Sequence, residues 1–430
     1  MKKISRRNFS HIFGGAATVA LGSNLFPSPS LTSTRPRVVI IGGGAGGATV
    51  ARHLAQDFPR IDVTLVEANK HYTASYFSNR YVGGINTLES ITHSYEILRK
   101  KFGINVVHDL ALRIDGQKRT VTLKGGDTLS WDRLVVAPGI DFKFNSIDGY
   151  DEAVAKTMPH AYKSDAQVSI LMRQLREMKD GGLFVISVPK RPYRCPPAPY
   201  ERAAMAAFYM KYHKPRSKII ILDAKDEYPL SEVLSEIWES RYQGMVEWVP
   251  SEFGGEVMAV DAKTRTLITG EEKFRADVAN VIPPHHAGKI AQVSGLVDNS
   301  GWCPVNPLTF ESSLAPAIHL VGDAIDSGDM PKAAFAANNQ ALACSDSVGA
   351  ALTGIKAKKH VLKNTCFFLA AGGYGLKLGG SYKATTKRLV GVSGFSSQVG
   401  EPESLRRKTA DEGEAWYKRI TKDMFGRIEA

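Results

Sequence analysis

The chain has 430 residues, of which 43% are hydrophobic, and its formal net charge is +12. This length supplies apolar residues for two or three domains, because a single core usually stops growing near about 250–300 residues. The charged residues form no blocks of one sign, so a nucleic-acid-binding groove is not indicated. No apolar run beyond the N-terminus reaches the roughly 20 residues that a membrane-spanning helix needs.

The first thirty residues have the pattern of a twin-arginine export signal. The motif Ser5-Arg6-Arg7-Asn8-Phe9 is followed by an apolar run over 12–26. We expect residues 1–30 to be a signal peptide and the mature protein to be periplasmic, where disulfides persist. Because this segment holds four basic and no acidic residues, the net charge of the rest is about +8. That charge either steers an anionic substrate or an acidic partner, or serves solubility alone.

Predicted strands and helices alternate along the chain in two α/β halves. In the first half we expect strands at 37–41, 62–67 and 134–137, a helix at 48–57, and a β-meander between 105 and 129. In the second half we expect strands at 183–188 and 218–223, helices at 198–213 and 231–242, and short strands between 255 and 282. A strand at 318–322 returns to the pattern of the first half, and a third region runs from about 356 to a final helix at 403–425. The apolar stripe of that helix favours docking on the core over a membrane anchor.

A glycine-rich turn joins the first predicted strand to the first helix. Gly42, Gly44 and Gly47 form the fingerprint Gly-x-Gly-x-x-Gly in the strand–turn–helix setting that dinucleotide-binding folds require. These glycines allow the turn, let the backbone approach a pyrophosphate and let helix and strand pack closely, while the helix N-terminus offers free N–H groups. Glu67 ends the second strand, where a carboxylate binds the adenosine ribose hydroxyls and repels a 2′-phosphate. The pattern favours FAD or NAD over NADP.

Two later segments resemble the glutathione-reductase-like flavoenzymes. Gly322 and Asp323 lie in a Val-Gly-Asp motif like that family's second flavin motif, in which the aspartate binds the ribityl chain. Ala137 and Gly139 lie in a strand-plus-glycine connector like the family's link between domains. The three motifs in this order imply FAD as cofactor. A helix beginning near 330 would direct its N-terminus to the flavin, and Lys332 either adds charge there or is a solvated lysine.

The resemblance implies an α/β fold with two Rossmann-like domains of the glutathione-reductase type and a C-terminal α+β domain that covers the flavin. We expect the FAD domain to comprise 35–145 and 285–355, the second domain 146–284, and the C-terminal domain 356–430. The strand at 183–188 leads into Pro-Lys-Arg-Pro-Tyr-Arg-Cys-Pro-Pro, which contains no glycine and four prolines that lack amide donors. We therefore expect no NAD(P)H site in the second domain.

The chain has four cysteines, Cys195, Cys303, Cys344 and Cys366, and no Cys-x-x-Cys-His motif for c-type haem. Cys195 lies just ahead of a predicted helix start, which favours the thiolate form. Glu201 follows about one turn into that helix and is placed to move protons near the sulfur. No metal site is predicted.

The cysteine segments resemble the flavoprotein subunit of flavocytochrome c sulfide dehydrogenase. The matching segments are Arg194-Cys195-Pro196-Pro197-x-Pro199-Tyr200-Glu201-Arg202, Asn364-Thr365-Cys366, Gly301-Trp302-Cys303-Pro304-Val305, Met330-Pro331-Lys332 and Ala415-Trp416-Tyr417. The resemblance implies a disulfide between Cys195 and Cys366 beside the flavin, with Cys303 and Cys344 as packing residues. It further implies FAD-dependent oxidation of sulfide to polysulfide or sulfur, with electrons passed to a c-type cytochrome whose haem is on a separate chain.

One segment departs from that family. The family often has a cysteine in Tyr-Thr-Cys-x-x-Ser-Asn that is bonded to the flavin, whereas this chain reads Tyr-Thr-Ala-Ser-Tyr-Phe-Ser-Asn over 72–79. Ser75 takes the place of the cysteine and cannot readily form the thioether, so we expect non-covalent FAD, with Asn79 in its site. The alternatives are a sulfide:quinone oxidoreductase and a non-catalytic electron-transfer flavoprotein whose disulfide is structural.

Overall fold

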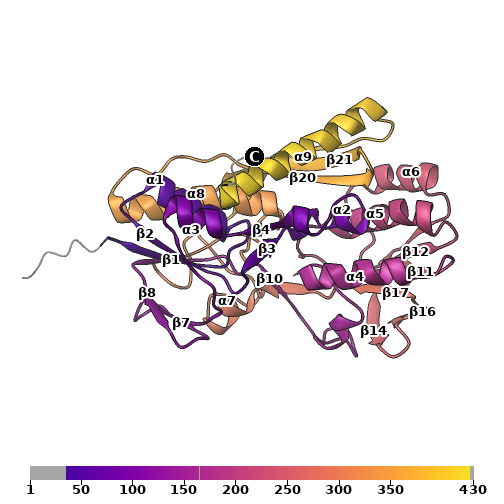
Figure 1. Ribbon diagram of the computed structural model, residues 1–430, viewed down its shortest axis with the longest axis horizontal. Helices are drawn as coiled ribbons and strands as arrows, with labels where there is room; N and C mark the ends of the chain where they lie inside the picture. Colours follow the sequence, from indigo (N-terminus) through magenta and orange to yellow (C-terminus); the bar gives the residue numbers. More distant parts are fainter. Residues whose placement is uncertain (1–34, 164, 427–430) are drawn as a thin grey trace, which may run out of the picture. The chain divides into compact units, whose positions relative to one another are not determined.

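The computed structural model describes residues 35–163 and 165–426, so the predicted signal peptide lies outside the described residues. A parallel five-stranded sheet has the strand order β19-β9-β1-β2-β5. Its strands β1 and β2 are labelled in Figure 1. Its strands are β19 (Ile318–Leu320), β9 (Arg133–Val136), β1 (Arg37–Ile41), β2 (Asp62–Val66) and β5 (Asn105–Val107). The register aligns Ile41 with both Val66 and Val136, so the carboxyl ends of these strands lie at one edge. Helices α1 (Gly47–Asp57) and α8 (Ala334–Thr353) pack against each other.

A second parallel sheet has the order β13-β12-β11-β17. Its strands are β13 (Val246–Val249), β12 (Lys218–Asp223), β11 (Leu183–Val188) and β17 (Val278–Val281), and its helices are α4 (Asp165–Glu177), α5 (Ala198–His213) and α6 (Ser231–Arg241). Strand β11 is an apolar run buried from Phe184 onward, as a strand covered on both faces requires. The two parallel sheets confirm the predicted α/β class.

The remaining strands form small antiparallel sheets. They are β3 (His71–Thr73) with β4 (Thr92–Ser94), β6 (Ala111–Asp115) with β7 (Thr120–Leu123) and β8 (Thr128–Ser130), β10 (Ile140–Phe142) with β18 (His285–Ala287), and β14 (Val257–Asp261) with β15 (Thr266–Thr269) and β16 (Lys273–Arg275). The short helices are α2 (Asn79–Val82), α3 (Glu96–Phe102) and α7 (Lys289–Val293). Strands β20 (Leu362–Ala371), β21 (Tyr374–Ala384) and β22 (Leu389–Ser396) form the C-terminal sheet, which is followed by α9 (Glu403–Phe425).

The apolar stripe of α9 is docked on the protein, as the sequence predicts. Tyr417 stacks on Phe77 with ring centroids 4.0 Å apart, and Trp416 stacks on Phe335 at 5.8 Å. Met424 is fully buried. Among the described residues, no helix has both the length and the hydropathy to cross a bilayer.

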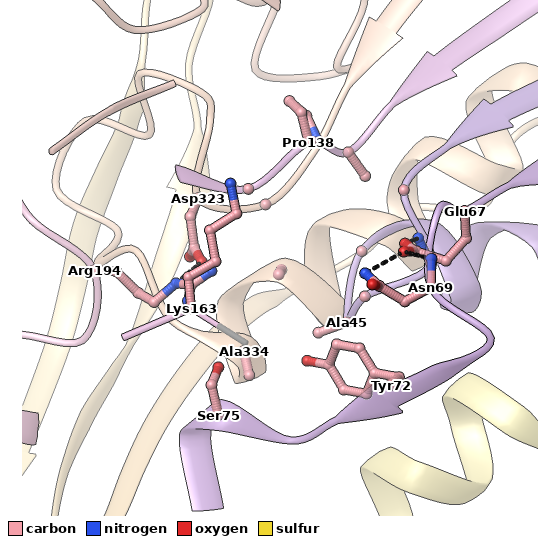
Figure 2. A pocket seen from close by; sticks show the side chains of 18 of the residues that line it. Ala45, Glu67, Asn69, Tyr72, Ser75, Pro138, Lys163, Arg194, Asp323 and Ala334 are labelled. Atoms are coloured by element: carbon pink, nitrogen blue, oxygen red, sulfur yellow. Dashed lines mark hydrogen bonds and ion pairs between the residues drawn. The ribbon is translucent and has the colours of Figure 1, made fainter. Parts of the chain in front are cut away.

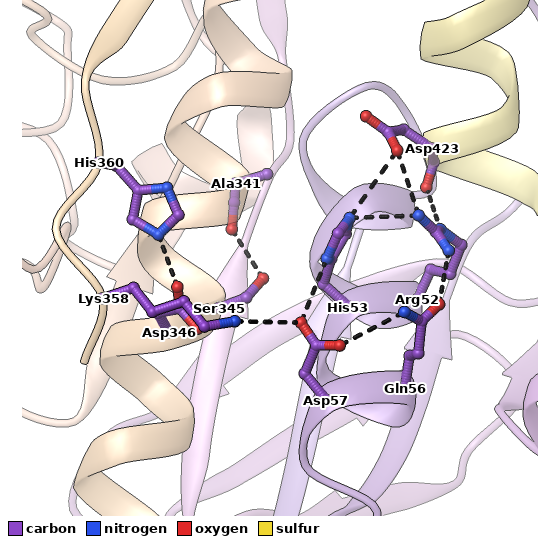
Figure 3. A network of polar contacts seen from close by, with 10 residues as sticks. All are labelled: Arg52, His53, Gln56, Asp57, Ala341, Ser345, Asp346, Lys358, His360 and Asp423. Carbon is purple, nitrogen blue, oxygen red and sulfur yellow. Dashed lines mark hydrogen bonds and ion pairs between the residues drawn. The ribbon is translucent and has the colours of Figure 1, made fainter. Parts of the chain in front are cut away.

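Polar contacts also fasten α9 to the first domain (Figure 3). The Arg52 guanidinium on α1 donates to the Asp423 carbonyl at 2.6 Å and to its carboxylate at 3.1 Å. Beyond the end of α8, the His360 ring lies 2.6 Å from the Asp346 carboxylate. These contacts hold the C-terminal helix and the start of the C-terminal sheet against α1 and α8.

Candidate active site

A cavity of about 800 Å³ lies at the carboxyl edge of the five-stranded sheet (Figure 2). Among the residues assigned from sequence to a dinucleotide, Gly42, Gly44, Glu67, Ala137 and Gly139 line it. Asn79, Gly322 and Asp323 line it too, together with Ser75, Cys195 and Glu201. Gly47, Lys332 and Cys366 are not among the residues that line it. Most of the residues that sequence reasoning assigned to one site therefore surround one cavity.

The glycine-rich turn forms a cradle that larger residues would fill. Gly42 has a φ of +96°, and a Cβ atom there would lie 2.3 Å from the Ala137 carbonyl oxygen. A Cβ on Gly47 would lie 1.8 Å from the Gly42 carbonyl oxygen, so α1 and β1 approach as closely as they do only because this residue is glycine. The Glu67 carboxylate accepts from the Gly43 amide at 2.8 Å, which ties the turn to the residue after β2.

The opposite wall carries a carboxylate that has one buried oxygen without a hydrogen bond. Asp323 accepts from Arg194 Nε at 2.9 Å through Oδ2, whereas its buried Oδ1 has no hydrogen-bond partner within the described residues. Gly322 has a φ of +84° and donates its amide to Gln340 at 2.8 Å, which fixes the turn before Asp323. A free acceptor at this point fits a ribityl hydroxyl, and the glycine cradle fits a pyrophosphate. These residues fit FAD.

The two assigned cysteines are neighbours although they are 171 residues apart in the sequence. Cys195 lines the cavity in a left-handed backbone conformation with a φ of +52°, and its amide donates to the Lys332 carbonyl at 2.7 Å. Cys366 lies on β20 within hydrogen-bonding reach of the Cys195 thiol. The expected disulfide is not formed here, since all four cysteines within the described residues are free thiols. The contact shows that the two sulfurs meet.

The acidity of the pair differs from the expectation that a helix start makes Cys195 the thiolate. The hydrogen bond to Cys366 and burial raise the pKa of Cys195, whereas the same hydrogen bond lowers the pKa of Cys366. Cys366 also accepts from Asn364 Nδ2 at 3.5 Å, and a sulfur that accepts two donors is the better place for the charge. In addition, Cys195 precedes by two residues the N-cap of α5, which is Pro197.

Glu201 is held rigidly next to the cysteines. Its Oε2 accepts from Asn79 Nδ2 at 2.7 Å, and its Oε1 accepts from the Leu369 amide of β20 at 3.0 Å. Burial raises the pKa of Glu201 to about 6, although both hydrogen bonds oppose the shift. A carboxyl group with a pKa near neutrality suits proton transfer.

Two assigned cofactor residues are engaged elsewhere. The Lys332 ammonium donates to the Ile325 carbonyl at 2.5 Å and lies 3.6 Å from the ring centroid of Trp302, and burial lowers its pKa to about 8. Lys332 does not line the cavity, and its ammonium group interacts with the Ile325 carbonyl and the Trp302 ring instead. Asn79 lines the cavity, but its amide is bonded to Glu201 rather than free for a flavin. The sequence motif places both residues near the site without indicating where their side chains point.

Sequence reasoning did not assign Arg194, Arg202 or Tyr162 to the site, yet all three line the cavity. The two arginines begin and end the Arg194–Arg202 motif around Cys195. That motif is the sequence signal that could have assigned them to the site. Lys163 also lines the cavity and pairs with Asp141 at 2.7 Å. Within the described ranges, no cluster of side chains suited to a metal is present, so none is assigned.

Aromatic side chains fill the place where the second sheet would bind a nucleotide. Asp223 ends β12, the position at which such folds bind a ribose, but it is fully buried. Its carboxylate accepts from the Tyr200 hydroxyl at 2.5 Å and from Trp248 Nε1 at 3.0 Å. Tyr200 in turn stacks on Tyr228 with ring centroids 4.4 Å apart. The acid that could bind a ribose is therefore occupied by the protein itself.

The fold and the cavity define the chain as a flavoprotein of the pyridine nucleotide-disulphide oxidoreductase class, whose family model matches residues 36–169. Residues 168–283 match the central domain of the sulfide dehydrogenase [flavocytochrome c] flavoprotein chain, and residues 358–425 match the flavocytochrome c sulphide dehydrogenase flavin-binding domain. Two separate stretches of the chain thus match models of the flavocytochrome c sulfide dehydrogenase flavoprotein.

Curated relatives include the mitochondrial sulfide:quinone oxidoreductase of Dictyostelium discoideum, which is 24% identical over 303 residues that cover 67% of this chain and 65% of that protein. The sulfide-quinone reductase of Aquifex aeolicus is 27% identical over 184 residues, or 42% of this chain and 41% of that protein. The matches thus span less than two thirds of these relatives. The crystal structure of the Aquifex aeolicus sulfide:quinone oxidoreductase superposes with a TM-score of 0.73 at 17% identity, covering 91% of this chain and 92% of that chain. That likeness shows a shared fold.

Proposed function

We propose that the protein oxidises sulfide in the periplasm through a redox disulfide between Cys195 and Cys366 and passes the electrons to a c-type cytochrome. The observation that supports this most directly is the meeting of the two sulfurs at the wall of the cavity, with the Glu201 carboxylate held beside them. A structural staple would need the sulfur contact but not the neighbouring carboxyl group with a raised pKa.

The chemistry begins from the oxidised pair. Hydrosulfide attacks one sulfur of the disulfide, which breaks the S–S bond and yields a cysteine persulfide and a cysteine thiolate. Glu201 accepts the persulfide proton. A second hydrosulfide attacks the outer sulfur, so that hydrodisulfide leaves and both cysteines are reduced. Each turnover thus leaves two electrons on the protein, and bound FAD supplies their acceptor.

The residues around the cavity would hold FAD in one orientation. The Gly42–Gly46 turn and the start of α1 would bind the pyrophosphate, and Glu67 and Asp323 would bind ribose and ribityl hydroxyls. Cys195 is the cysteine of the pair that lines the cavity, so its sulfur is the one placed to face the flavin. Ser75 lines the same cavity and carries no thiol, which supports non-covalent FAD.

The acceptor separates the two candidate activities. The relatives named above are sulfide:quinone oxidoreductases, which favours quinone as the second candidate. The apolar stripe of α9, a potential membrane contact, is instead buried against Phe77 and Phe335, and the family models are those of a flavocytochrome chain. The sequence has no Cys-x-x-Cys-His motif to attach c-type haem, so the cytochrome would be a separate polypeptide.

The test is an anaerobic steady-state assay of FAD-loaded protein with sulfide and either oxidised cytochrome c or a soluble quinone. We expect sulfide-dependent reduction of cytochrome c, and Glu201→Gln to lower kcat by about 10²-fold because proton transfer of this kind contributes 10²–10⁴-fold. Reduction of the quinone alone would contradict the proposed acceptor. Periplasmic location is tested by replacing Arg6 and Arg7 with lysine, which should retain the protein in the cytoplasm.

A further inference from the structure

Asn79 lies between the Glu201 carboxylate and a buried arginine. Its Nδ2 donates to Glu201 Oε2 at 2.7 Å and to the Ala198 carbonyl at 3.1 Å. Its Oδ1 accepts from Arg202 Nε at 3.1 Å. The exposed fractions of Asn79, Glu201 and Arg202 are 4%, 7% and 2%, so water does not compete for these bonds. A flipped amide would point its carbonyl at the carboxylate and its NH₂ at the guanidinium, which fixes the orientation of Asn79.

The arginine behind Asn79 is itself immobilised. Arg202 donates to Asn280 Oδ1 at 2.8 Å, to the His160 carbonyl at 3.2 Å and to the Ala161 carbonyl at 2.7 Å. Asn280 is part of β17 and is fully buried. The chain of bonds therefore runs from the second parallel sheet through Arg202 and Asn79 to Glu201. It ends at the Leu369 amide on β20, the strand that carries Cys366.

We propose that Asn79 is a positioning residue for Glu201, and that its amide, braced by Arg202, keeps the carboxylate ionised and fixed beside the cysteine pair. The proposal rests on the proposed function, in which Glu201 accepts the persulfide proton.

The elements that pack against Glu201 place charged and titratable groups next to its carboxylate. Arg80 on α2 and Arg202 on α5 favour the carboxylate. Cys195 precedes α5 and Cys366 lies on β20, and the Glu201 charge raises the pKa of both thiols. The two hydrogen bonds from Asn79 and from the Leu369 amide favour the carboxylate as well. Of these two hydrogen bonds, the one from Asn79 comes from a side chain. A single substitution can therefore remove it without removing a charge.

The test is the pH dependence of Glu201 protonation, followed in the holoprotein by the infrared carbonyl band that disappears in Glu201→Gln. Asn79→Leu keeps the branched shape and the number of heavy atoms of the side chain and removes its donor. We expect the protonation midpoint to rise by about 1–2 pH units, since a hydrogen bond to a charged group contributes roughly that much. Asn79→Asp retains an acceptor for Arg202, removes the donor and adds a negative charge, so its midpoint should rise at least as far.

Asn338→Leu is the matched control, because Asn338 is also a buried amide. Its Nδ2 donates to Oγ1 of Thr49, a residue of α1, at 3.0 Å. The Glu201 midpoint of this variant should equal that of the wild type. An unchanged midpoint in Asn79→Leu and Asn79→Asp, with flavin content and thermal unfolding preserved, would overturn the proposal. The acidic limb of sulfide-dependent flavin reduction should shift by the same amount. If the wild type does not react with sulfide, the proposed function fails, while the infrared midpoints still decide the role of Asn79.

Discussion

Replacing Gly47 with alanine should damage both folding and FAD binding. The added Cβ would lie 1.8 Å from the Gly42 carbonyl oxygen, whereas real Cβ contacts stay above 3.0 Å, so α1 and β1 must separate by about 1.2 Å. Overpacking of this kind typically costs about 1–3 kcal/mol of the free energy of unfolding. The same movement takes the N-terminus of α1 away from the phosphates, and we expect the Kd for FAD to rise at least about tenfold, or about 1.4 kcal/mol.

Gly44→Ala separates the two effects. Its Cβ would meet only Tyr72, at an ordinary 3.5 Å, so the fold should tolerate it, but Gly44 lines the cavity and the methyl group would occupy phosphate space. Chemical denaturation should show a loss of stability in Gly47→Ala only, and flavin-fluorescence titration should show weaker FAD binding in both variants. A wild-type unfolding midpoint and a wild-type Kd in Gly47→Ala would refute the reasoning.

Three further outcomes follow from individual side chains. Burial lowers the pKa of His160 to about 3, below its ordinary 6.5, so the folded state resists protonation of this ring. The free energy of unfolding should therefore fall as the pH drops from 6.5 towards 3. Thermal unfolding measured against pH should show a flatter slope in His160→Gln. Asp323→Leu removes the partner of Arg194 and the free Oδ1, and should lower FAD retention after gel filtration about tenfold or more, whereas a wild-type flavin content would speak against a ribityl contact. Acid precipitation of the wild type should release all flavin into the supernatant, because Ser75 provides no thiol, and flavin that stays with the pellet would exclude non-covalent binding.

Much of the fold could be predicted because its signals are local. Strand β11, helix α5 and helix α9 have the bounds that the apolar patterns and the proline and glycine positions predict. The glycine fingerprint predicted the cradle equally well, since a turn between a buried strand and a helix depends on neighbouring residues alone. The meeting of Cys195 and Cys366 came from family resemblance, because contacts over such a separation have no local pattern.

Side-chain directions in the site could not be predicted for the same reason. Asn79 points at Glu201 because Arg202, braced by β17, takes its oxygen, and no short segment contains those three partners. Lys332 points away from the cavity because Trp302 and a backbone carbonyl satisfy its ammonium. The greater acidity of Cys366 depends on hydrogen bonds from Cys195 and Asn364, and the Cys195 thiol reaches the Cys366 sulfur only in the folded protein.

The most direct test is anaerobic titration of the FAD-loaded, oxidised protein with sulfide, followed by the absorbance of the flavin. We predict that sulfide bleaches the wild type and the control Cys344→Ala, whose cysteine is buried in α8, while Cys195→Ser and Cys366→Ser stay oxidised and NADH has no effect on any of them. Bleaching of either serine variant at the wild-type rate, or bleaching of the wild type by NADH, would contradict sulfide oxidation through this cysteine pair.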